Sequence, residues 1–342
     1  MRLIQVGLGG FGRSWAALAR EAAGVELVAV ADADAAARER AQTALGLPAT
    51  AVHPSLDAAL AAAPDAAVLV ATPPETHRSV AALALAAGRD VLLEKPLATT
   101  LDDARALVAT ADRAGRVLMV SQNYRFRRPT RTVQRLVAEG TIGALTAVTI
   151  RFRRDSRAFW PTTNFRYEMR HPLLLDMSIH HLDLLRAVTG REVRSLYARG
   201  WRVPDSPYRH DPAAIAVMEL AGGATVVYEG DWATHDRETS WNGEWELLGE
   251  RGRLRWLGGE EDALTGEVIV EAWGETARVV EQPDLPYVDR QGTLDAFRVA
   301  VESGAEPETS ARDNVRSLGI VLGCVASIER GDAVTLGDEG DW

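Results

Sequence analysis

The chain has 342 residues, of which 46% are hydrophobic and 25% are charged, and its net charge is −10. These values are ordinary for a globular protein and exclude disordered and fibrous classes, while the length predicts two domains, each with its own core. The acidic balance argues against nucleic acid as a partner, and no apolar run reaches the roughly 18 residues that cross a membrane.

The chain runs directly into an apolar strand pattern at residues 2–6, with no hydrophobic leader before it, so we expect a cytoplasmic protein. Its one cysteine, Cys324, excludes an intrachain disulfide framework and a cysteine-based zinc site, and we expect no metal. Cys324 lies in an apolar helical pattern, which predicts a core position. One basic cluster is typical of a solvated helix face. It consists of Arg125, Arg127, Arg128 and Arg131.

A glycine-rich turn follows the first strand, at Gly7-Leu8-Gly9-Gly10-Phe11-Gly12. Gly7 permits a tight turn, Gly9 lets backbone N–H groups approach a pyrophosphate, and Gly12 allows a helix to pack closely on the strand. The helix that begins here would direct its N-terminus at the anion. The turn, including Gly10 and Phe11, is therefore the predicted cofactor loop.

A second strand pattern at residues 25–31 ends in Asp32, twenty residues after the last glycine of the turn. A carboxylate at this position accepts hydrogen bonds from an adenosine ribose. The next two residues are not basic, so no adjacent cation binds a 2′-phosphate, and NAD is favoured over NADP. Arg38 or Arg40 would reverse that preference if either reached the ribose. The alternative interpretation is a glycine turn with a surface aspartate.

Strand and helix patterns alternate through residue 120, which predicts a doubly wound parallel sheet. Apolar strand patterns occupy 66–71, 91–93 and 117–120, and alanine-rich helices occupy 75–87 and 99–114. Ligands of such sheets bind beyond the carboxyl ends of the strands. The predicted ligand-lining residues at those ends are Thr72, Pro73, Glu94, Lys95 and Gln122.

After residue 122 the pattern changes to long alternating strands, typical of an antiparallel sheet that follows a helix at 129–139. The strands are predicted at 145–152, 193–203, 213–220, 223–232, 244–249 and 267–273. Two closing helices, at 290–303 and 311–330, return toward the first domain. The predicted domains are 1–122, a dinucleotide-binding α/β domain, and 123–342, an α+β domain for substrate binding and oligomerisation.

Residues 173–188 have helical periodicity, and within them Asp176 and His180 are four apart, so both project from one face. Asp183 lies on the same face. Taken alone, such a pair is more often a helix-stabilising interaction. His181 is rotated by about 100° from His180 on an ideal helix, and we expect it to contact the neighbouring sheet or to pack.

These motifs occur in one order along the chain: the glycine turn, Asp32, Thr72-Pro73-Pro74-Glu75-Thr76-His77, Glu94-Lys95-Pro96, Tyr124-Arg125-Phe126 and Asp176-Met177-Ser178-Ile179-His180. The series resembles the glucose–fructose oxidoreductase, inositol dehydrogenase and rhizopine-catabolism (Gfo/Idh/MocA) family over essentially the full chain. The resemblance implies an N-terminal Rossmann domain, a C-terminal domain with a large, mostly antiparallel open sheet, and a homo-oligomer, either dimer or tetramer. It also implies catalytic roles for Lys95, Asp176 and His180, and a cis bond between Lys95 and Pro96.

Those roles agree with the chemistry of alcohol oxidation. A base must accept the hydroxyl proton as hydride leaves carbon, and the imidazole of His180 suits that task because imidazole titrates near neutrality. The Lys95 ammonium would stabilise developing alkoxide charge. Asp176 either orients His180 or binds a second hydroxyl of the substrate.

Further contacts are predicted around these groups. The predicted cofactor contacts are Gly7, Gly9, Gly10, Phe11, Gly12, Asp32, Thr72, Pro73, His77, Glu94, Lys95 and Gln122. Glu94 would contact the nicotinamide ribose or buffer Lys95, and His77 equally fits a packed or capping role. The predicted substrate contacts are Lys95, Tyr124, Arg125, Asp176, His180, Trp241 and Asn242. An indole packs well on a sugar, but Trp241 equally fits the packing face of the sheet or a subunit interface.

One segment departs from the family pattern. His171-Pro172-Leu173-Leu174-Leu175 stands where many members have a glycine-rich run, so we expect a different local backbone and a different mouth of the substrate site. His171 is a candidate substrate contact or an exposed loop histidine.

The predicted function is hydride transfer by an NAD(H)-dependent oxidoreductase between nicotinamide and a secondary hydroxyl, or the matching ketone, of a sugar, cyclitol or related polyol. One alternative is a glycosidase of the same family that uses NAD transiently; glycoside cleavage without a net change in NADH absorbance would identify it. A second alternative is a non-catalytic NAD-binding sensor or scaffold, which would have no need of Lys95, Asp176 and His180 together.

Overall fold

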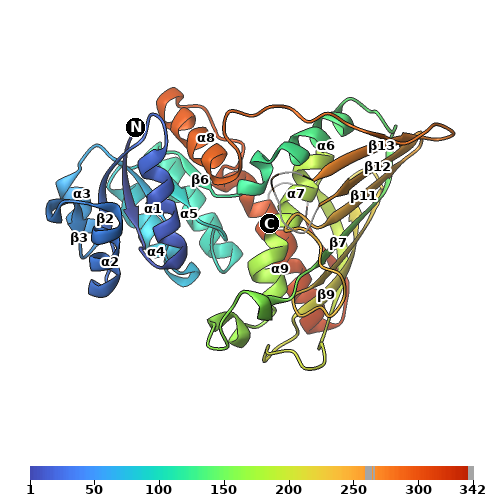
Figure 1. Cartoon of the computed structure of the whole chain (residues 1–342), viewed down its shortest axis with the longest axis horizontal. Helices are drawn as coiled ribbons and strands as arrows, with labels where there is room; N and C mark the ends of the chain where they lie inside the picture. The colour runs from blue at the N-terminus through green and yellow to red at the C-terminus, as the bar shows by residue number, and fades with distance from the viewer. Residues whose placement is uncertain (259–263, 265, 338–342) are drawn as a thin grey trace. The chain divides into compact units, whose positions relative to one another are not determined.

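The computed structural model describes residues 1–258, 264 and 266–337, which divide into two compact units (Figure 1). The first unit contains Met1–Asn123 and the segment Arg290–Val315. The second contains Tyr124–Asp289 and the chain from Arg316 on. A segment from the last quarter of the chain therefore completes the first unit. The predicted boundary after residue 122 stays a prediction.

The described part of the first unit contains one parallel sheet with the strand order β3-β2-β1-β4-β5-β6. The order reverses beside β1, as in doubly wound dinucleotide-binding folds, so the predicted sheet is confirmed. Its strands are β1 (Arg2–Val6), β2 (Glu26–Ala31), β3 (Val52–His53), β4 (Ala67–Val70), β5 (Val91–Leu93) and β6 (Leu118–Val120). Its helices are α1 (Gly10–Glu21), α2 (Ala35–Leu45), α3 (Leu56–Ala62), α4 (His77–Ala86), α5 (Leu101–Ala114) and α8 (Asp289–Ser303). The short helices of the unit are η1 (Ala49–Ala51) and η2 (Pro74–Thr76).

The sequence of the first unit explains these elements. Every residue of β4, β5 and β6 is buried, as expected for parallel strands covered by helices on both faces. Helix α5 begins where the Thr100 hydroxyl accepts a hydrogen bond from the N–H of Asp103, and it ends at Gly115, whose φ is +61°. Strong local signals of this kind are why the predicted helices at 75–87 and 99–114 agree with the structure.

The described part of the second unit contains one sheet with the order β14-β13-β12-β11-β7-β10-β9-β8-β15. Neighbouring strands are antiparallel except β7 and β10, which are parallel. The strands are β7 (Leu145–Arg153), β8 (Val193–Trp201), β9 (Ala213–Leu220), β10 (Thr225–Asp231), β11 (Glu244–Gly249), β12 (Gly252–Leu257), β13 (Glu267–Ala272), β14 (Arg278–Val279) and β15 (Val334–Thr335). The predicted mostly antiparallel sheet is confirmed, whereas β12, β14 and β15 were not predicted.

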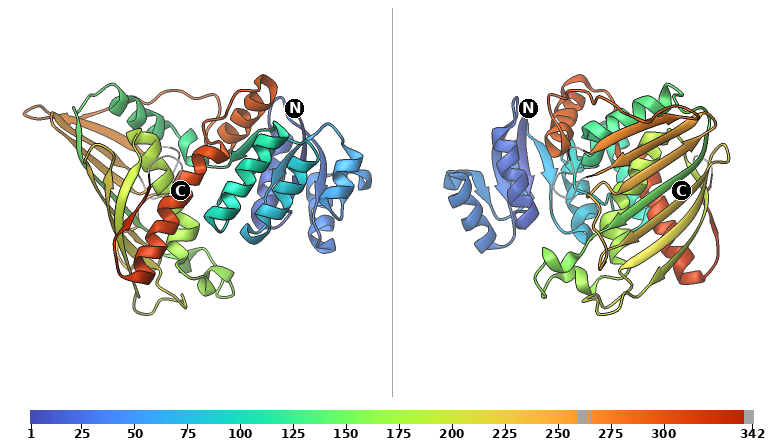
Figure 2. Two further views of the ribbon diagram at one scale, coloured as in Figure 1. Left: turned by 180° about the vertical axis from the view of Figure 1, so that it is seen from behind. Right: turned by 45° about the vertical axis from the view of Figure 1, so that its right-hand side comes forward.

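Helices cover one face of this sheet, and the right-hand view of Figure 2 shows the other face with no helix over it. The helices of the second unit are α6 (Arg128–Ala138), α7 (Ile179–Thr189) and most of α9 (Ala311–Arg330). Shorter helices are η3 (Asn123–Phe126), η4 (Ser156–Ala158), η5 (Phe165–Glu168) and the π-helix η6 (Leu173–Ser178). Burial alternates along β9, where Ile215 and Val217 are exposed and Ala216 and Met218 are buried.

The core of the second unit is rich in large aromatic side chains between the sheet and its helices. Trp232, Trp245 and Trp256 are each no more than 1% exposed. Cys324 of α9 is fully buried, which confirms its predicted core position. Across residues 1–258, 264 and 266–337, no helix is both long enough and apolar enough to cross a membrane.

Candidate active site

The glycine turn connects β1 to α1 at the carboxyl edge of the parallel sheet. Gly7 has a φ of +93°, and a Cβ there would lie 2.4 Å from the carbonyl oxygen of Ala71. A Cβ on Gly12 would lie 2.2 Å from the carbonyl oxygen of Gly7. Both separations are far below van der Waals contact, so the turn requires glycine at these two positions.

Gly9 and Gly10 have open surroundings instead. No heavy atom of another described segment lies within 4 Å of a Cβ built on either residue. Gly9 is the N-cap of α1 and supplies no side chain to satisfy the first N–H groups of that helix. These N–H groups are therefore available to an anion such as a pyrophosphate. Phe11, in the first turn of α1, is 56% exposed beside this opening.

Gln5 stabilises the glycine turn through its side-chain amide. Its side chain is fully buried in β1, and its Nε2 donates to the carbonyl oxygens of Gly7, at 3.0 Å, and Gly12, at 2.6 Å. One amide group thus ties together the two glycines that cannot be replaced. The sequence prediction missed Gln5, although a glutamine inside an otherwise apolar strand was the available signal.

Asp32 follows β2 and contacts the glycine turn directly. Its Oδ2 accepts a hydrogen bond of 2.7 Å from the N–H of Leu8, and its Oδ1 accepts one of 2.9 Å from the N–H of Asp34. Two carboxylate oxygens have about four acceptor sites, so this anchoring leaves capacity for a ribose hydroxyl. Arg38 donates to the carbonyl oxygens of Asp32 and Ala33, which places its guanidinium beside the end of β2.

His77, at the start of α4, connects two loops at the carboxyl edge. Its Nδ1 lies 2.7 Å from the carbonyl oxygen of Pro96, and its Nε2 lies 2.9 Å from that of Thr72. The side chain is buried, and this burial lowers its pKa. A neutral imidazole donates to one of these two carbonyls at a time. The bonds place His77, Thr72 and the Lys95-Pro96 segment next to one another, with Pro73 beside Thr72.

Glu94 and Lys95 follow β5. Glu94 is buried; its Oε1 accepts a 2.7 Å hydrogen bond from Nε1 of Trp15, and its Oε2 accepts one of 3.1 Å from the N–H of Lys95. Burial raises the pKa of Glu94, and the nearby Lys95 ammonium opposes that shift. The Lys95-Pro96 bond is cis, as the resemblance implies. Gln122, after β6, is buried at the same edge.

Asp176 and His180 lie at the junction of two kinds of helix in the second unit. Asp176 belongs to the π-helical segment Leu173–Ser178, and His180 belongs to α7. The prediction of one regular helix over residues 173–188 is therefore wrong in its first six residues. A run of three leucines fits a wide turn as well as a regular one, which is why periodicity did not reveal the π-helix. Such wide turns are frequent at functional sites.

Asp176 is held by Arg166, which the sequence prediction missed. Nε of Arg166 donates to Oδ2 of Asp176 at 2.5 Å, and Nη2 donates to Oδ1 at 3.3 Å. The guanidinium carbon lies 4.7 Å from the ring centroids of both Trp160 and Phe165. A planar cation fixed by two rings presents a defined geometry to the carboxylate.

His180 stacks on Tyr124, with 4.3 Å between ring centroids and 8° between ring planes. The guanidinium carbon of Arg127 also lies over the Tyr124 ring, 3.2 Å from its centroid. His180 is 7% exposed. Burial raises the pKa of Tyr124, which therefore stays a neutral phenol at physiological pH. The structure thus brings together the predicted residues Tyr124 and His180.

His181 contacts the sheet, which confirms one of its two expected placements. Its Nε2 lies 2.9 Å from the carbonyl oxygen of Trp241, and its Nδ1 lies 3.2 Å from Oη of Tyr228 in β10. An imidazole with its proton on Nε2 satisfies both neighbours, since it donates to the carbonyl and accepts from the phenol. Burial lowers the pKa of His181 to about 4, so it is neutral under ordinary conditions.

Arg125 is directed into the unit rather than toward solvent. Its Nε and Nη2 donate to the two carboxylate oxygens of Asp183 at 2.7 and 2.6 Å, and Ser317 of α9 donates to the same carboxylate at 2.6 Å. Arg125 and Arg127 are each 5% exposed. The interpretation of the basic cluster as a solvated helix face is therefore wrong for these two arginines, because Arg125 pairs with the buried Asp183 and Arg127 pairs with the partly buried Asp289.

The predicted tryptophan and asparagine contacts have different environments. Asn242 is fully buried, accepts a hydrogen bond from Arg127 through Oδ1, and accepts another from Nε1 of Trp245 through its carbonyl oxygen. Trp241 is partly exposed, and the guanidinium carbon of Arg154 lies 4.8 Å from its ring centroid. His171 has a φ of +47° and lies 3.4 Å from Oε1 of Glu329 in α9.

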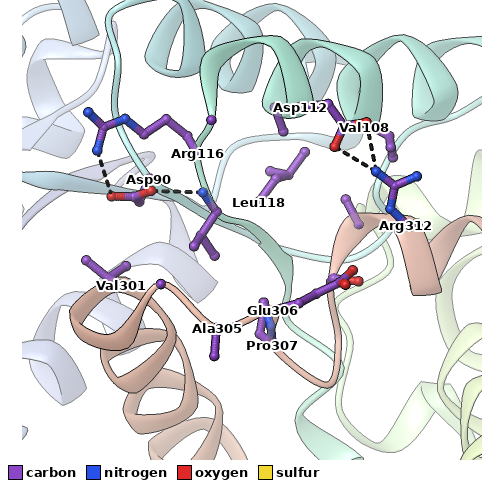
Figure 3. Close-up of a pocket in the computed structure, with 16 residues that line it drawn as sticks. Asp90, Val108, Asp112, Arg116, Leu118, Val301, Ala305, Glu306, Pro307 and Arg312 are labelled. Atoms are coloured by element: carbon purple, nitrogen blue, oxygen red, sulfur yellow. Dashed lines mark hydrogen bonds and ion pairs between the residues drawn. The ribbon is translucent and has the colours of Figure 1, made fainter.

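Figure 3 shows a cavity of about 370 Å³ in the first unit. It lies at the amino ends of β5 and β6, where Asp90 pairs with Arg116 and Asp112 pairs with Arg312. The glycine turn, Glu94 and Lys95 follow the carboxyl ends of their strands, at the opposite edge of the same sheet. In the part of the chain that the structure describes, no group of three or more histidine, cysteine, aspartate or glutamate residues is placed to hold a metal.

Comparison with known proteins agrees with this geometry. Residues 1–122 match the family described as "Oxidoreductase family, NAD-binding Rossmann fold", and residues 130–255 match the "GFO/IDH/MocA C-terminal domain". A D-apiose dehydrogenase of Paraburkholderia graminis is 30% identical over 97% of this chain and 88% of its own. The chain belongs to the Gfo/Idh/MocA oxidoreductase family. An inositol 2-dehydrogenase of Rhizobium meliloti is 26% identical over 95% of this chain and 97% of its own.

Comparison with a solved structure shows the same fold. An oxidoreductase from Agrobacterium radiobacter, in complex with NAD⁺, L-tartaric acid and magnesium, is 23% identical, with a TM-score of 0.85 over 98% of both chains. The family matches and the relatives confirm the predicted family, oxidoreductase class and NAD-binding Rossmann domain, and the solved structure agrees with the predicted fold. This Gfo/Idh/MocA chain is an enzyme of a family that contains sugar and cyclitol dehydrogenases.

Proposed function

We propose that this enzyme transfers a hydride between NAD and a secondary hydroxyl, or the matching ketone, of a sugar, cyclitol or related polyol. The observation that carries the proposal is the presence of two proton-handling groups, Lys95 and His180, in a chain whose first 122 residues match an NAD-binding family. Relatives named for D-apiose and inositol support the substrate class.

The first unit fits NAD. The open space over Gly9 and Gly10 and the uncapped N–H groups of α1 suit a pyrophosphate, and Asp32 suits the adenosine ribose. Thr72, Pro73, His77, Glu94, Lys95 and Gln122 would hold the remainder of the cofactor. When bound, NAD supplies the hydride acceptor for an alcohol or, as NADH, the hydride donor for a ketone.

In alcohol oxidation His180 takes the hydroxyl proton, because a neutral imidazole accepts a proton near physiological pH. Its stacking on Tyr124 fixes the plane of the ring and hence the direction of its lone pair. Lys95 donates to the substrate oxygen and stabilises the negative charge that develops there. In ketone reduction His180 returns the proton to the same oxygen.

Asp176 binds a second hydroxyl of the substrate in this proposal. Arg166 neutralises part of its charge and fixes its orientation through two hydrogen bonds. Partly exposed Trp241 offers an indole face to a sugar ring. The buried side chains of Arg125 and Asn242 support Asp183 and Arg127 instead, and direct substrate contact by either remains a prediction.

The decisive experiment records absorbance at 340 nm for the purified protein with NAD, and in parallel with NADP, across inositols, aldoses, sugar acids and aryl glycosides. NADH formation with one class of polyol is the expected result and would name the substrate class. Release of an aryl group without a change at 340 nm would replace the proposal with the redox-assisted glycosidase. Tight NAD binding without turnover of any polyol would favour the sensor.

We also propose that the uncovered face of the large sheet forms a homo-oligomer, either dimer or tetramer. Tyr197 and Trp201 of β8 and Ile215 and Val217 of β9 are each 37–46% exposed, an apolar group that solvent-facing strands usually avoid. Light scattering should give a multiple of 37.0 kDa for the wild type. Ile215→Glu with Val217→Lys should reduce that mass to one chain; an unchanged oligomer would place the interface elsewhere.

A further inference from the structure

One arginine of the returning segment packs on the N-terminal turns of α1. Nη1 of Arg290, in the first turn of α8, donates to Oγ of Ser14 at 2.7 Å. Its guanidinium carbon lies 5.1 Å from the ring centroid of Phe11 and 5.4 Å from that of Trp15. These three residues of α1 share one helical face, because they are three and four positions apart. Arg290 therefore lies beside the start of α1 (Figure 1), although 276 residues separate it from Ser14 in the chain.

This position adjoins the open part of the glycine turn. Gly9 and Gly10 are exposed, and a Cβ built on either would meet no other described segment within 4 Å. Phe11 follows them directly and is 56% exposed, and Arg290 is partly exposed. A ligand from solvent can therefore reach the guanidinium. A phosphate held by the first N–H groups of α1 would lie on the same helical turn that Arg290 contacts.

The charges at this helix end are the reverse of those usual at the start of a helix. The first N–H groups of a helix carry a partial positive charge, which acidic side chains usually offset. Helix α1 has no acidic residue in its first turn and no side-chain cap at Gly9, and Arg290 adds a cation beside it. The two positive groups are unfavourable together, and both would stabilise an anion bound between them. In a chain of net charge −10, this concentration of positive charge indicates an anionic ligand.

We propose that Arg290 binds the pyrophosphate of NAD through its guanidinium. A guanidinium has five N–H donors in a planar fork, so it can bond to Ser14 and to a phosphate at the same time. The rings of Phe11 and Trp15 fix its plane before the cofactor binds, which reduces the entropy cost of ordering a long side chain. The sequence prediction placed every cofactor contact at or before residue 122, and Arg290 adds one from α8. The inference rests on the place that the proposed function gives to the pyrophosphate.

The test compares ligands that differ in their phosphates. Dissociation constants for NAD and ADP are measured by calorimetry, and that for adenosine, which has no phosphate, by competition with ADP. We expect Arg290→Met to raise the Kd for NAD and for ADP about tenfold, equivalent to about 1.4 kcal/mol, and to leave the Kd for adenosine within about twofold. Methionine keeps an unbranched apolar chain beside the two rings, so the packing of α8 on α1 is retained.

Two further variants separate a direct contact from a general effect of charge. Arg298→Met removes a cation about two turns further along α8, where it pairs with Asp295 and Glu302, and should leave all three constants within about twofold. Arg290→Lys keeps the charge but loses the planar fork, so its Kd for ADP should be intermediate. Raising the salt concentration from about 50 to about 300 mM should weaken ADP binding more in the wild type than in Arg290→Met, because salt screens the charge that methionine lacks.

Three outcomes would overturn the proposal. Equal weakening of ADP and adenosine binding in Arg290→Met would assign Arg290 a structural role. An unchanged Kd for ADP would show that the backbone N–H groups bind the pyrophosphate without it. An equal effect of Arg298→Met would show a long-range effect of charge instead of a contact. Each of these results leaves the proposed reaction intact, whereas wild-type protein that binds neither NAD nor ADP would overturn both.

Discussion

The candidate cofactor loop in the first unit and the candidate proton-transfer group in the second are shaped by different means. At the glycine turn, the site is formed by glycines, which have no side chain, packed against backbone carbonyl groups. Most of these residues are close in sequence. Around Asp176 and His180, long side chains define the site, and their partners come from other segments of the unit. We therefore expect the first region to be most sensitive to substitutions that add a side chain, and the second to substitutions that remove a charge.

The largest loss of stability should follow from breaking the buried ion pair between Arg125 and Asp183 in the second unit. Asp183→Ala removes the carboxylate that accepts hydrogen bonds from Arg125 and Ser317. Leaving a buried guanidinium without its carboxylate costs about 3–5 kcal/mol. Asp112→Ala, which breaks the exposed pair with Arg312, should cost about 0–1 kcal/mol. Urea unfolding measures both, and equal losses would show that burial of the Arg125 pair is energetically unimportant.

The steric requirement of the glycine turn should appear in cofactor affinity. Gly12→Ala places a Cβ against the carbonyl of Gly7 and must displace the turn. We expect the Kd for NAD to rise about 100-fold, equivalent to about 2.7 kcal/mol. Gly10→Ala meets no neighbouring segment and should leave the unfolding temperature unchanged, whereas Gly12→Ala should lower it. Calorimetry and thermal unfolding test this, and wild-type behaviour of Gly12→Ala would remove the steric argument.

Acid should destabilise the second unit through His181. The pKa of His181 falls from its ordinary value near 6.5 to about 4 on folding, so between these pH values the unfolded chain binds a proton that the folded chain does not. Stability is therefore complete above pH 6.5 and is lost as the pH falls toward 4. From pH 7.5 to pH 5 the loss attributable to His181 is about 2 kcal/mol. Urea unfolding of the wild type and His181→Leu should differ in pH dependence by that amount; equal pH dependence would contradict the lowered pKa.

Arg166 should have a smaller effect, confined to catalysis. Arg166→Met removes the guanidinium that orients Asp176 but keeps an unbranched chain between Trp160 and Phe165. We expect kcat/KM for the polyol to fall about tenfold, with an unchanged Kd for NAD. Arg166→Lys should restore part of the loss. A matching increase in the Kd for NAD would instead assign Arg166 to the cofactor.

The difference between the two regions also explains what the sequence could predict. Gly7, Gly12 and Asp32 follow a strand, turn, helix and strand in local order, so spacing alone indicates the cofactor loop. Arg166 holds Asp176 across a loop of irregular structure, and Arg125 pairs with a carboxylate 58 residues away; neither pairing has a periodic signal.

Two further features depended on tertiary structure. The π-helix over residues 173–178 has the same apolar composition as a regular turn. Gln5 stands in an apolar strand, and its hydrogen bonds to the carbonyl oxygens of Gly7 and Gly12 appear only in the folded structure. Composition and periodicity indicate which local structure a segment prefers. They do not indicate which distant side chain forms a hydrogen bond or an ion pair with a given polar residue.

The central claim is that His180 transfers the proton. Its most direct test measures the kcat for polyol oxidation and the Kd for NAD of His180→Ala. The account predicts a kcat for polyol oxidation about 10² to 10⁴ times lower than that of the wild type, with the Kd for NAD within about twofold, since the imidazole transfers the proton and does not hold the cofactor. Added free imidazole should restore part of the lost rate. A kcat close to that of the wild type would contradict proton transfer at His180.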